Sequence, residues 1–151
     1  MARIVGNWWN DTLNGTDNAD EIEGEGGDDV ISGEGGNDVL LGGSGDDTIV
    51  ATLGVDEIEG GSGNDSITVE GGDWFRFDRV DGGSGNDMIR LEGTKILAFG
   101  GDGNDTFRTD LGKETILVGG AGSDRFVITG GAIGSGRVAE LHGGDAIVVT
   151  S

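Results

Sequence analysis

The chain has 151 residues, of which 34 are glycine and none is cysteine, and its 29 acids against 9 bases leave a net charge of -20. The length suits one domain, and the lack of cysteine excludes a disulfide framework and a thiolate metal site. The charge excludes nucleic acid and anionic membrane surfaces as partners and favours cations. Because only 34% of the residues are hydrophobic, we expect the bare chain to fold poorly and a bound metal to stabilise it.

The first residues carry no standard secretory signal, because Met1–Gly15 lacks a basic segment followed by an apolar stretch. No segment approaches the ~20 apolar residues of a membrane span. Trp8 and Trp9 precede the first repeat, and we expect this pair to cap the open end of the fold. Residues 1–14 are therefore predicted to be an N-terminal cap.

From Gly15 onward the chain repeats a nine-residue unit with Asp at its sixth position and an apolar residue at its eighth. Six units run without a gap over residues 15–68, among them GGSGDDTIV (42–50) and GGSGNDSIT (60–68). After an interruption at Val69–Asp81 the units resume at residue 82, and a last, eroded copy is ELHGGDAIV (140–148). Complete turns begin at 24, 42, 60, 82, 100 and 119, so the structural period is about two units, or 18 residues.

Each unit predicts a short strand with one inward apolar residue, followed by a glycine-rich turn. We therefore expect an all-β fold without helices, a parallel β-roll or β-helix solenoid with two strands and two turns in each coil. One inner ladder is expected from the eighth-position residues Ile31, Ile49, Ile67, Ile89, Phe107 and Phe126. The opposite ladder is expected from Ile22, Leu40, Ile58 and Ile116.

The two series of turns differ in how well they keep the motif. The units at 15 and 33 keep the sixth-position Asp, the unit at 51 is weaker, and those at 91 and 109 have lost it. The solenoid, predicted over residues 15–151, should therefore hold metal better on one side.

The interruption concentrates aromatic and basic residues in a chain that has few of either. We expect an enlarged coil in which Phe75 and Phe77 point inward on alternate strand positions. The alternative is a protruding patch in which Trp74, Arg76 and Arg79 grip a polysaccharide or protein partner.

The turns Gly-Gly-x-Gly-x-Asp place backbone carbonyls and a carboxylate in one tight bend. This environment of hard oxygen ligands suits Ca²⁺ better than zinc or copper. Aspartates on stacked turns would repel one another, and a divalent ion between them would join the turns instead.

The repeats resemble those of the repeats-in-toxin (RTX) family, whose nonapeptide is GGxGxDxUx and whose β-roll is filled with calcium. The resemblance implies carboxylate ligands at Asp29, Asp47, Asp65, Asp87, Asp105 and Asp124 on the well-kept side, and at Asp20, Asp38 and Asp56 on the other. It implies further ligands from the turns at Gly24, Gly26, Gly33, Gly35, Gly42, Ser44, Gly60, Ser62, Gly82, Ser84, Gly100, Asp102, Gly119 and Ala121. Gaps between these turns imply about seven ions.

By this resemblance we expect a non-catalytic, bacterial calcium-binding module that folds on binding extracellular calcium and supports secretion, folding or surface presentation. Type I secretion through a C-terminal signal would account for the missing N-terminal one. The alternative is a surface-recognition module for adhesion, polysaccharide or ice, although an ice-binding row would need a regular Thr where this chain has Gly26, Ser44, Ser62, Ser84, Asp102 and Ala121. A third reading is an accessory module of a polysaccharide-active enzyme.

His142 has no partner motif and is expected in a turn.

Overall fold

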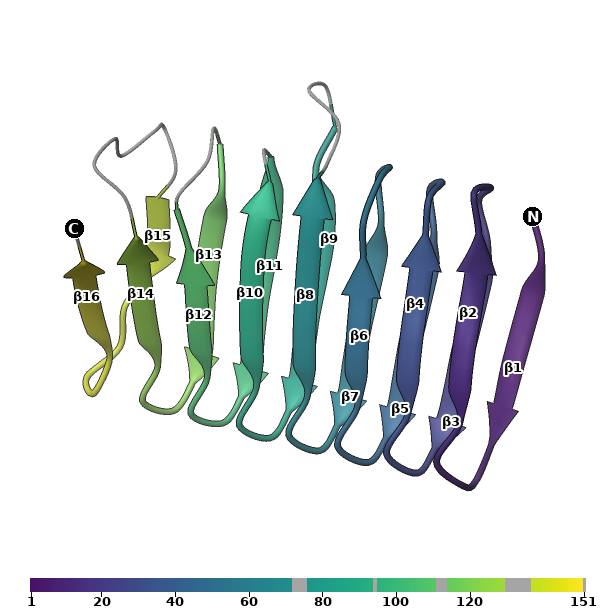
Figure 1. Cartoon of the computed structure of the whole chain (residues 1–151). Helices are drawn as coiled ribbons and strands as arrows, with labels where there is room; N and C mark the ends of the chain where they lie inside the picture. The colour runs from purple at the N-terminus through teal and green to yellow at the C-terminus, as the bar shows by residue number, and fades with distance from the viewer. Residues whose placement is uncertain (72–75, 94, 111–113, 130–136, 151) are drawn as a thin grey trace.

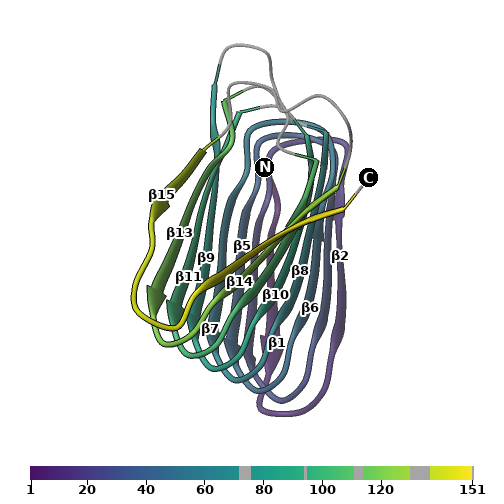
Figure 2. The same ribbon diagram turned by 90° about the vertical axis from the view of Figure 1, so that its left-hand side faces the viewer.

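The computed structural model describes residues 1–71, 76–93, 95–110, 114–129 and 137–150, and all regular structure in them is β. Two sheets, each of eight parallel strands, face each other and form a solenoid (Figure 1). Viewed from the side of Figure 1, the coils stack behind one another as a flattened tube (Figure 2). The predicted all-β solenoid with coils of about 18 residues is confirmed.

The chain alternates between the two sheets. The odd-numbered sheet contains β1 (Arg3–Asn7), β3 (Glu21–Gly26), β5 (Val39–Ser44), β7 (Glu57–Ser62), β9 (Asp78–Ser84), β11 (Ile96–Asp102), β13 (Ile116–Ala121) and β15 (Arg137–Glu140). The even-numbered sheet contains β2 (Thr12–Thr16), β4 (Val30–Glu34), β6 (Thr48–Ala51), β8 (Ser66–Gly71), β10 (Met88–Gly93), β12 (Thr106–Thr109), β14 (Arg125–Thr129) and β16 (Ala146–Thr150).

Two rows of turns connect the sheets. We call the turns from an odd to the next even strand the lower turns; they are residues 8–11, 27–29, 45–47, 63–65, 85–87, 103–105, 122–124 and 141–145. The upper turns lead from an even strand back to the odd sheet and end before β3, β5, β7, β9, β11, β13 and β15. Figure 1 shows the lower turns as a regular row.

The core is built from the inward side chains of both sheets, which alternate with outward ones along each strand. The first predicted ladder, from Ile31 to Phe126, is confirmed, because its members are buried and paired strand by strand. Phe107 and Phe126 stack with ring centroids 5.0 Å apart. Apolar burial at successive rungs therefore joins each coil only to its neighbours.

The opposite ladder contains one error of prediction. Ile22, Leu40 and Ile58 are buried in register as expected, but Ile116 pairs with the outward-facing Leu97 and is only half-buried. Leu117 takes the inward position and is fully buried. The reason is one extra residue before Gly119. In each coil the inward residue lies two positions before the first glycine of the turn, and here that residue is Leu117. A shift of one residue turns a side chain to the opposite face of the sheet.

The insertion within residues 69–81 is confined to an upper turn. Val69 is buried at the end of β8, and Asp78 and Val80 are buried on β9, so both strands keep their place in the core. Because side chains alternate, Phe77 falls on the outer face and is 39% exposed. The expectation that Phe77 points inward is therefore wrong, whereas Trp74 and Phe75 lie outside the described residues.

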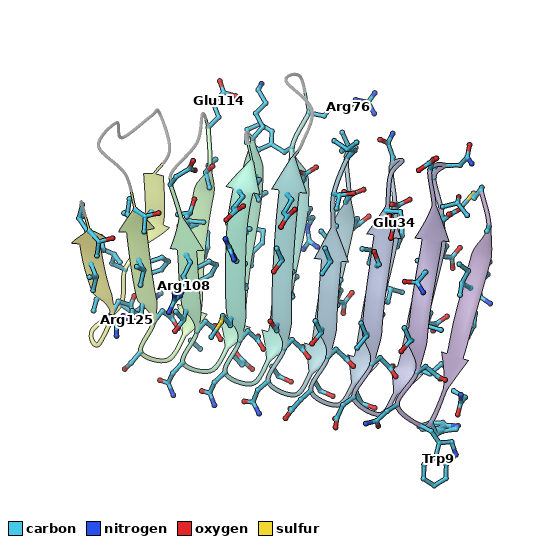
Figure 3. The ribbon with its side chains drawn as sticks, in the orientation of Figure 1. Trp9, Glu34, Arg76, Arg108, Glu114 and Arg125 are labelled. Carbon is cyan, nitrogen blue, oxygen red and sulfur yellow. The ribbon has the colours of Figure 1, made fainter. Side chains whose placement is uncertain are left out.

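The N-terminal residues continue the solenoid. β1 pairs with β3 and β2 pairs with β4, so residues 3–16 form a first coil. Trp8 and Trp9 lie in its lower turn and are 76% and 78% exposed, and their capping role stays a prediction. Figure 3 shows Trp9 projecting from the lower edge.

Candidate metal centre

Aspartates that end the turns form two rows along the edges of the solenoid. The lower row contains Asp11, Asp29, Asp47, Asp65, Asp87, Asp105, Asp124 and Asp145, and the upper row contains Asp20, Asp38, Asp56 and Asp78. All of them are at most 2% exposed except Asp11 and Asp145 in the first and last lower turns. The sequence prediction placed nine aspartates in these rows, and the structure brings all nine together.

One carboxylate oxygen of each aspartate is used by the fold. In the lower row the backbone N–H of Asp29 donates to Oδ1 of Asp47, and that of Asp47 donates to Oδ1 of Asp65, both at 2.8 Å. In the upper row the backbone N–H of Asp20 donates to Oδ1 of Asp38 at 2.9 Å. The same bond joins the later rungs of the lower row up to Asp145. These bonds hold the carboxylates in line, one coil after another.

The second oxygen, Oδ2, is buried and has no hydrogen-bond partner at many interior rungs. This holds for Asp29, Asp38, Asp47, Asp65, Asp87, Asp105 and Asp124. A buried carboxylate oxygen without a donor costs free energy, and such groups in proteins are normally paired or bound to a metal. The unused oxygens therefore point to cations that complete the rows.

Burial raises the pKa values of seven of the buried aspartates, because desolvation disfavours the charged form. It raises the pKa of Asp65 to about 7, and those of Asp47, Asp56 and Asp105 to about 6. The pKa values of Asp29, Asp38 and Asp87 are raised for the same reason. The stacked, uncompensated carboxylates are thus poorly accommodated as anions, and positive charge between them would remove the penalty.

The glycine at the first position of each turn keeps space beside Oδ2. A Cβ on Gly42 would lie 2.5 Å from Oδ2 of Asp47 and 2.4 Å from the carbonyl oxygen of Gly60 in the next coil. A Cβ on Gly60 would meet Asp65 and Gly82 in the same way. The same relation holds at Gly24, Gly82 and Gly100. A carboxylate oxygen and a backbone carbonyl therefore converge at every such rung.

The third-position residues of the lower motifs, whose carbonyls were predicted as further ligands, lie in register along one edge of the odd-numbered sheet. Gly26, Ser44, Ser62, Ser84, Asp102 and Ala121 are cross-strand neighbours at the ends of the odd-numbered strands. The carbonyl oxygens of Ser44 and Ser62 each accept one backbone N–H, from Gly27 and Gly45. A carbonyl oxygen has a second lone pair, so a further ligand is compatible with this bond.

The ends of the two rows are satisfied differently. Oδ2 of Asp11 accepts the backbone N–H and the Nδ2–H of Asn7 at 2.8 and 2.6 Å. Oδ2 of Asp20 accepts the backbone N–H and the hydroxyl of Thr16. The backbone N–H of Ala2, which donates to Oδ1, lowers the pKa of Asp20 most, and the bonds from Thr16 lower it further. At the other end, Oδ2 of Asp145 accepts the N–H of His142, which lies in the last lower turn as predicted. Hydrogen-bond donors thus satisfy these carboxylate oxygens, unlike the unpartnered Oδ2 atoms of the interior rungs.

Three members of the rows were missed from the sequence. Asp78 follows the insertion and begins the pattern DRV, with the apolar residue two positions later. Asp11 ends the hexapeptide GNWWND, which has the first Gly and sixth Asp but tryptophans between them. Asp145 is the sixth residue of the eroded last unit. In each case the Asp was present in the sequence, but the full Gly-Gly-x-Gly-x-Asp turn was not.

A second ladder lies outside the first, on the residue before each lower-row aspartate. It contains Asn10, Asp28, Asp46, Asn64, Asn86, Asn104 and Ser123, all exposed. The side-chain oxygen of Asp46 accepts the backbone N–H of Asn64 at 2.7 Å, and that of Asn64 accepts the N–H of Asn86 at 2.9 Å. Asn and Asp serve equally here, so this ladder requires an oxygen acceptor and no charge.

The donor set consists only of oxygen. Within the described ranges, no group of three or more His, Cys, Asp or Glu side chains is placed to hold a metal by side chains alone. Backbone carbonyls would therefore complete the coordination, and carboxylate plus carbonyl oxygen is the preference of Ca²⁺. Fold and site together define a parallel β-solenoid whose edges are built to bind hard divalent cations.

The model of the RTX calcium-binding nonapeptide repeat matches the chain in four copies, at residues 5–40, 41–73, 77–93 and 97–116. These copies cover more than half of the sequence, and the chain belongs to this family of calcium-binding repeats. No curated protein matches the chain. The part of the chain that the structure describes contains no helix suited to crossing a membrane.

Proposed function

We propose that the chain is a non-catalytic module that folds on binding extracellular calcium, and that it supports the secretion, folding or surface presentation of a bacterial protein. The observation that carries the proposal is the row of buried Oδ2 atoms without a hydrogen-bond partner. Membership of a structural calcium-binding repeat family supports the non-catalytic role.

The interior aspartates are proposed as the carboxylate ligands. They are Asp29, Asp38, Asp47, Asp56, Asp65, Asp87, Asp105 and Asp124, and Asp78 is added from its place in the upper row. Asp20 ends its row and has its Oδ2 bound by Thr16, so we assign it a weaker part than the sequence suggested. The carbonyl oxygens of first- and third-position residues such as Gly42 and Ser44 complete the sites, and about seven ions remain our prediction.

Calcium is proposed to decide whether the chain folds. The net charge of -20 opposes compaction, and apolar burial is limited to a narrow core two side chains wide. Metal binding to a site that exists only in the folded chain adds its free energy to folding. Sites of the extracellular class, with dissociation constants of about 10⁻⁴–10⁻³ M, would leave the chain unfolded inside a cell and folded outside.

The test is a titration of CaCl₂ into calcium-depleted protein, followed by far-UV circular dichroism and Trp fluorescence, with Mg²⁺ as the control. The proposal expects a cooperative transition from coil to β structure with calcium alone, and native mass spectrometry then gives the number of ions. A chain already fully β-structured without calcium, or one that never folds with it, contradicts the proposal.

A further inference from the structure

Three arginines lie on the outer face of the even-numbered sheet, in the half of the chain that is less acidic. Arg90 is on β10, Arg108 on β12 and Arg125 on β14, and all three are exposed. Arg90 and Arg108 are direct cross-strand neighbours. Figure 3 labels Arg108 and Arg125 on adjacent strands of the solenoid. The three side chains thus form a basic patch.

Two of the three arginines of this patch have no ion pair with an acid in the described part of the chain, although the composition makes acids abundant. Among the described residues, Arg3, Arg79 and Lys95 each pair with acids, and Arg90 pairs with Glu92, whereas no ion pair is made by Arg108 or Arg125. Like charges directly opposite each other on neighbouring strands, about 4.8 Å apart, destabilise a sheet. Glu92 neutralises Arg90, whereas Arg108 is exposed beside it with no ion pair among the described residues, so a bound anion would reduce the repulsion between the two arginines.

A groove of about 610 Å³ lies beside the patch. It is lined by Arg90, Leu91, Glu92, Gly93, Arg108, Thr109, Asp110 and Thr129. Its volume is in the range of small-molecule sites. The lining therefore offers guanidinium donors and carboxylate acceptors within one hollow.

The two acids of the lining restrict the ligand. Glu92 and Asp110 would repel a dense polyanion such as a nucleic acid, as would the charge of the whole chain. They would accept hydrogen bonds from hydroxyl groups, however. A ligand that carries one carboxylate and several hydroxyls satisfies both halves of the lining, because a carboxylate matches the planar fork of arginine.

We propose that this groove binds a sugar acid, either free or as one unit of an acidic polysaccharide. The carboxylate accepts hydrogen bonds from Arg108 and from the part of Arg90 that Glu92 leaves available. The hydroxyls donate to Glu92 and Asp110. The site lies on the outer face of the sheet, away from the aspartate rows, and it depends on the calcium-binding function only in that the coil must be folded.

The test is isothermal titration calorimetry of the whole chain in saturating calcium, after circular dichroism has shown β structure. The probe is tri-galacturonate, with galactotriose as the neutral control and galacturonate to separate a free sugar acid from a polymer. Arg108→Gln is compared with Arg3→Gln, which removes an exposed arginine on β1 that does not line the groove. Hexaglutamate tests whether an acidic peptide binds instead.

The proposal expects tri-galacturonate to bind and galactotriose not to bind. Loss of a charge-assisted hydrogen bond in Arg108→Gln should weaken binding by about tenfold or more, whereas Arg3→Gln should retain the wild-type affinity. The proposal is overturned if the folded protein does not bind, if both variants lose affinity equally, or if hexaglutamate binds as tightly as the sugar. Because folding is checked first, a failure here does not count against the calcium-dependent function.

Discussion

The backbone N–H of Asp47 donates a 2.8 Å hydrogen bond to Oδ1 of Asp65, the corresponding residue of the next coil. Oδ2 of the same Asp65 is buried and has no donor. The two oxygens of one carboxylate therefore have separate tasks. One fixes the spacing of the coils through the backbone, and the other is left for a cation.

The first prediction compares substitutions at two adjacent residues, Asp47 of the inner aspartate row and Asp46 of the outer ladder. Asp47→Asn keeps the Oδ1 acceptor and removes the charge beside the unpartnered Oδ2, so the calcium midpoint of folding should rise by about tenfold or more. The measurement is far-UV circular dichroism against calcium concentration.

Its control is Asp46→Asn. Asp46 is exposed and acts as an acceptor for Asn64, a part that asparagine already plays at Asn64 itself. This variant should keep the wild-type midpoint. Equal effects of the two substitutions would show that the loss at Asp47 reflects total charge and not a ligand.

The second prediction concerns the space that the first-position glycine preserves. In Gly42→Ala the new methyl group would lie 2.4 Å from the carbonyl oxygen of Gly60 and 2.5 Å from Oδ2 of Asp47. Because the backbone of two coils would have to shift, we expect the calcium-loaded fold to lose about 1–3 kcal/mol in urea unfolding.

The matched glycine is Gly143, which lies in the last lower turn with no atom within 4 Å of its would-be Cβ. Gly143→Ala should leave the free energy of unfolding unchanged within about 0.5 kcal/mol. A large loss there, or none in Gly42→Ala, would contradict the packing described for these turns.

The third prediction is that acid favours folding when calcium is absent. Burial raises the pKa of Asp65 to about 7 and those of Asp47, Asp56 and Asp105 to about 6, above the ordinary value of 3.8. The folded state then binds protons more tightly than the unfolded chain, so stability rises as the pH falls from about 7 toward about 4 and is lost as the pH rises again.

Circular dichroism of calcium-depleted protein between about pH 8 and pH 4 measures this effect. We expect more β structure at the acidic end, and we expect the calcium midpoint to rise there because protons compete for the same oxygens. A calcium-free chain that loses β structure on acidification would contradict the raised pKa values. The lowered pKa of Asp20 acts in the opposite direction and limits the gain below its ordinary range.

The repeat made most of this molecule predictable from its sequence, because a fixed spacing of Gly, Asp and an apolar residue determines which side chains lie above one another. The ladder from Ile31 to Phe126 follows from this spacing alone. Prediction failed where the repeat is one residue longer, as at Ile116, because a shift of one residue turns a side chain to the opposite face of the sheet.

Other failures arose where the motif lost its glycines but kept its geometry. Asp78 completes the upper row although aromatic residues precede it, and Asp11 completes the lower row behind two tryptophans. The backbone N–H groups of Asp11 and Asp78 donate to residues of the next coil, and the local sequence does not reveal these contacts. The basic patch was also hidden, since Arg90 and Arg108 are 18 residues apart and become neighbours only when the register is known.

The last prediction concerns the difference between interior and terminal rungs of the upper row. Oδ2 of Asp20 is bound by the backbone N–H and hydroxyl of Thr16, whereas Oδ2 of Asp38 has no donor. Asp38→Asn should therefore raise the calcium midpoint by about tenfold, as a lost ligand would. Asp20→Asn should change it by much less, although it should weaken the first coil because Asp20 also accepts the N–H of Ala2. Hydrogen exchange of the amides in residues 2–16, measured in saturating calcium, separates these two effects. If Asp20→Asn raises the midpoint as far as Asp38→Asn does, calcium binds at the end of the row as well, and the hydrogen bonds from Thr16 do not replace it.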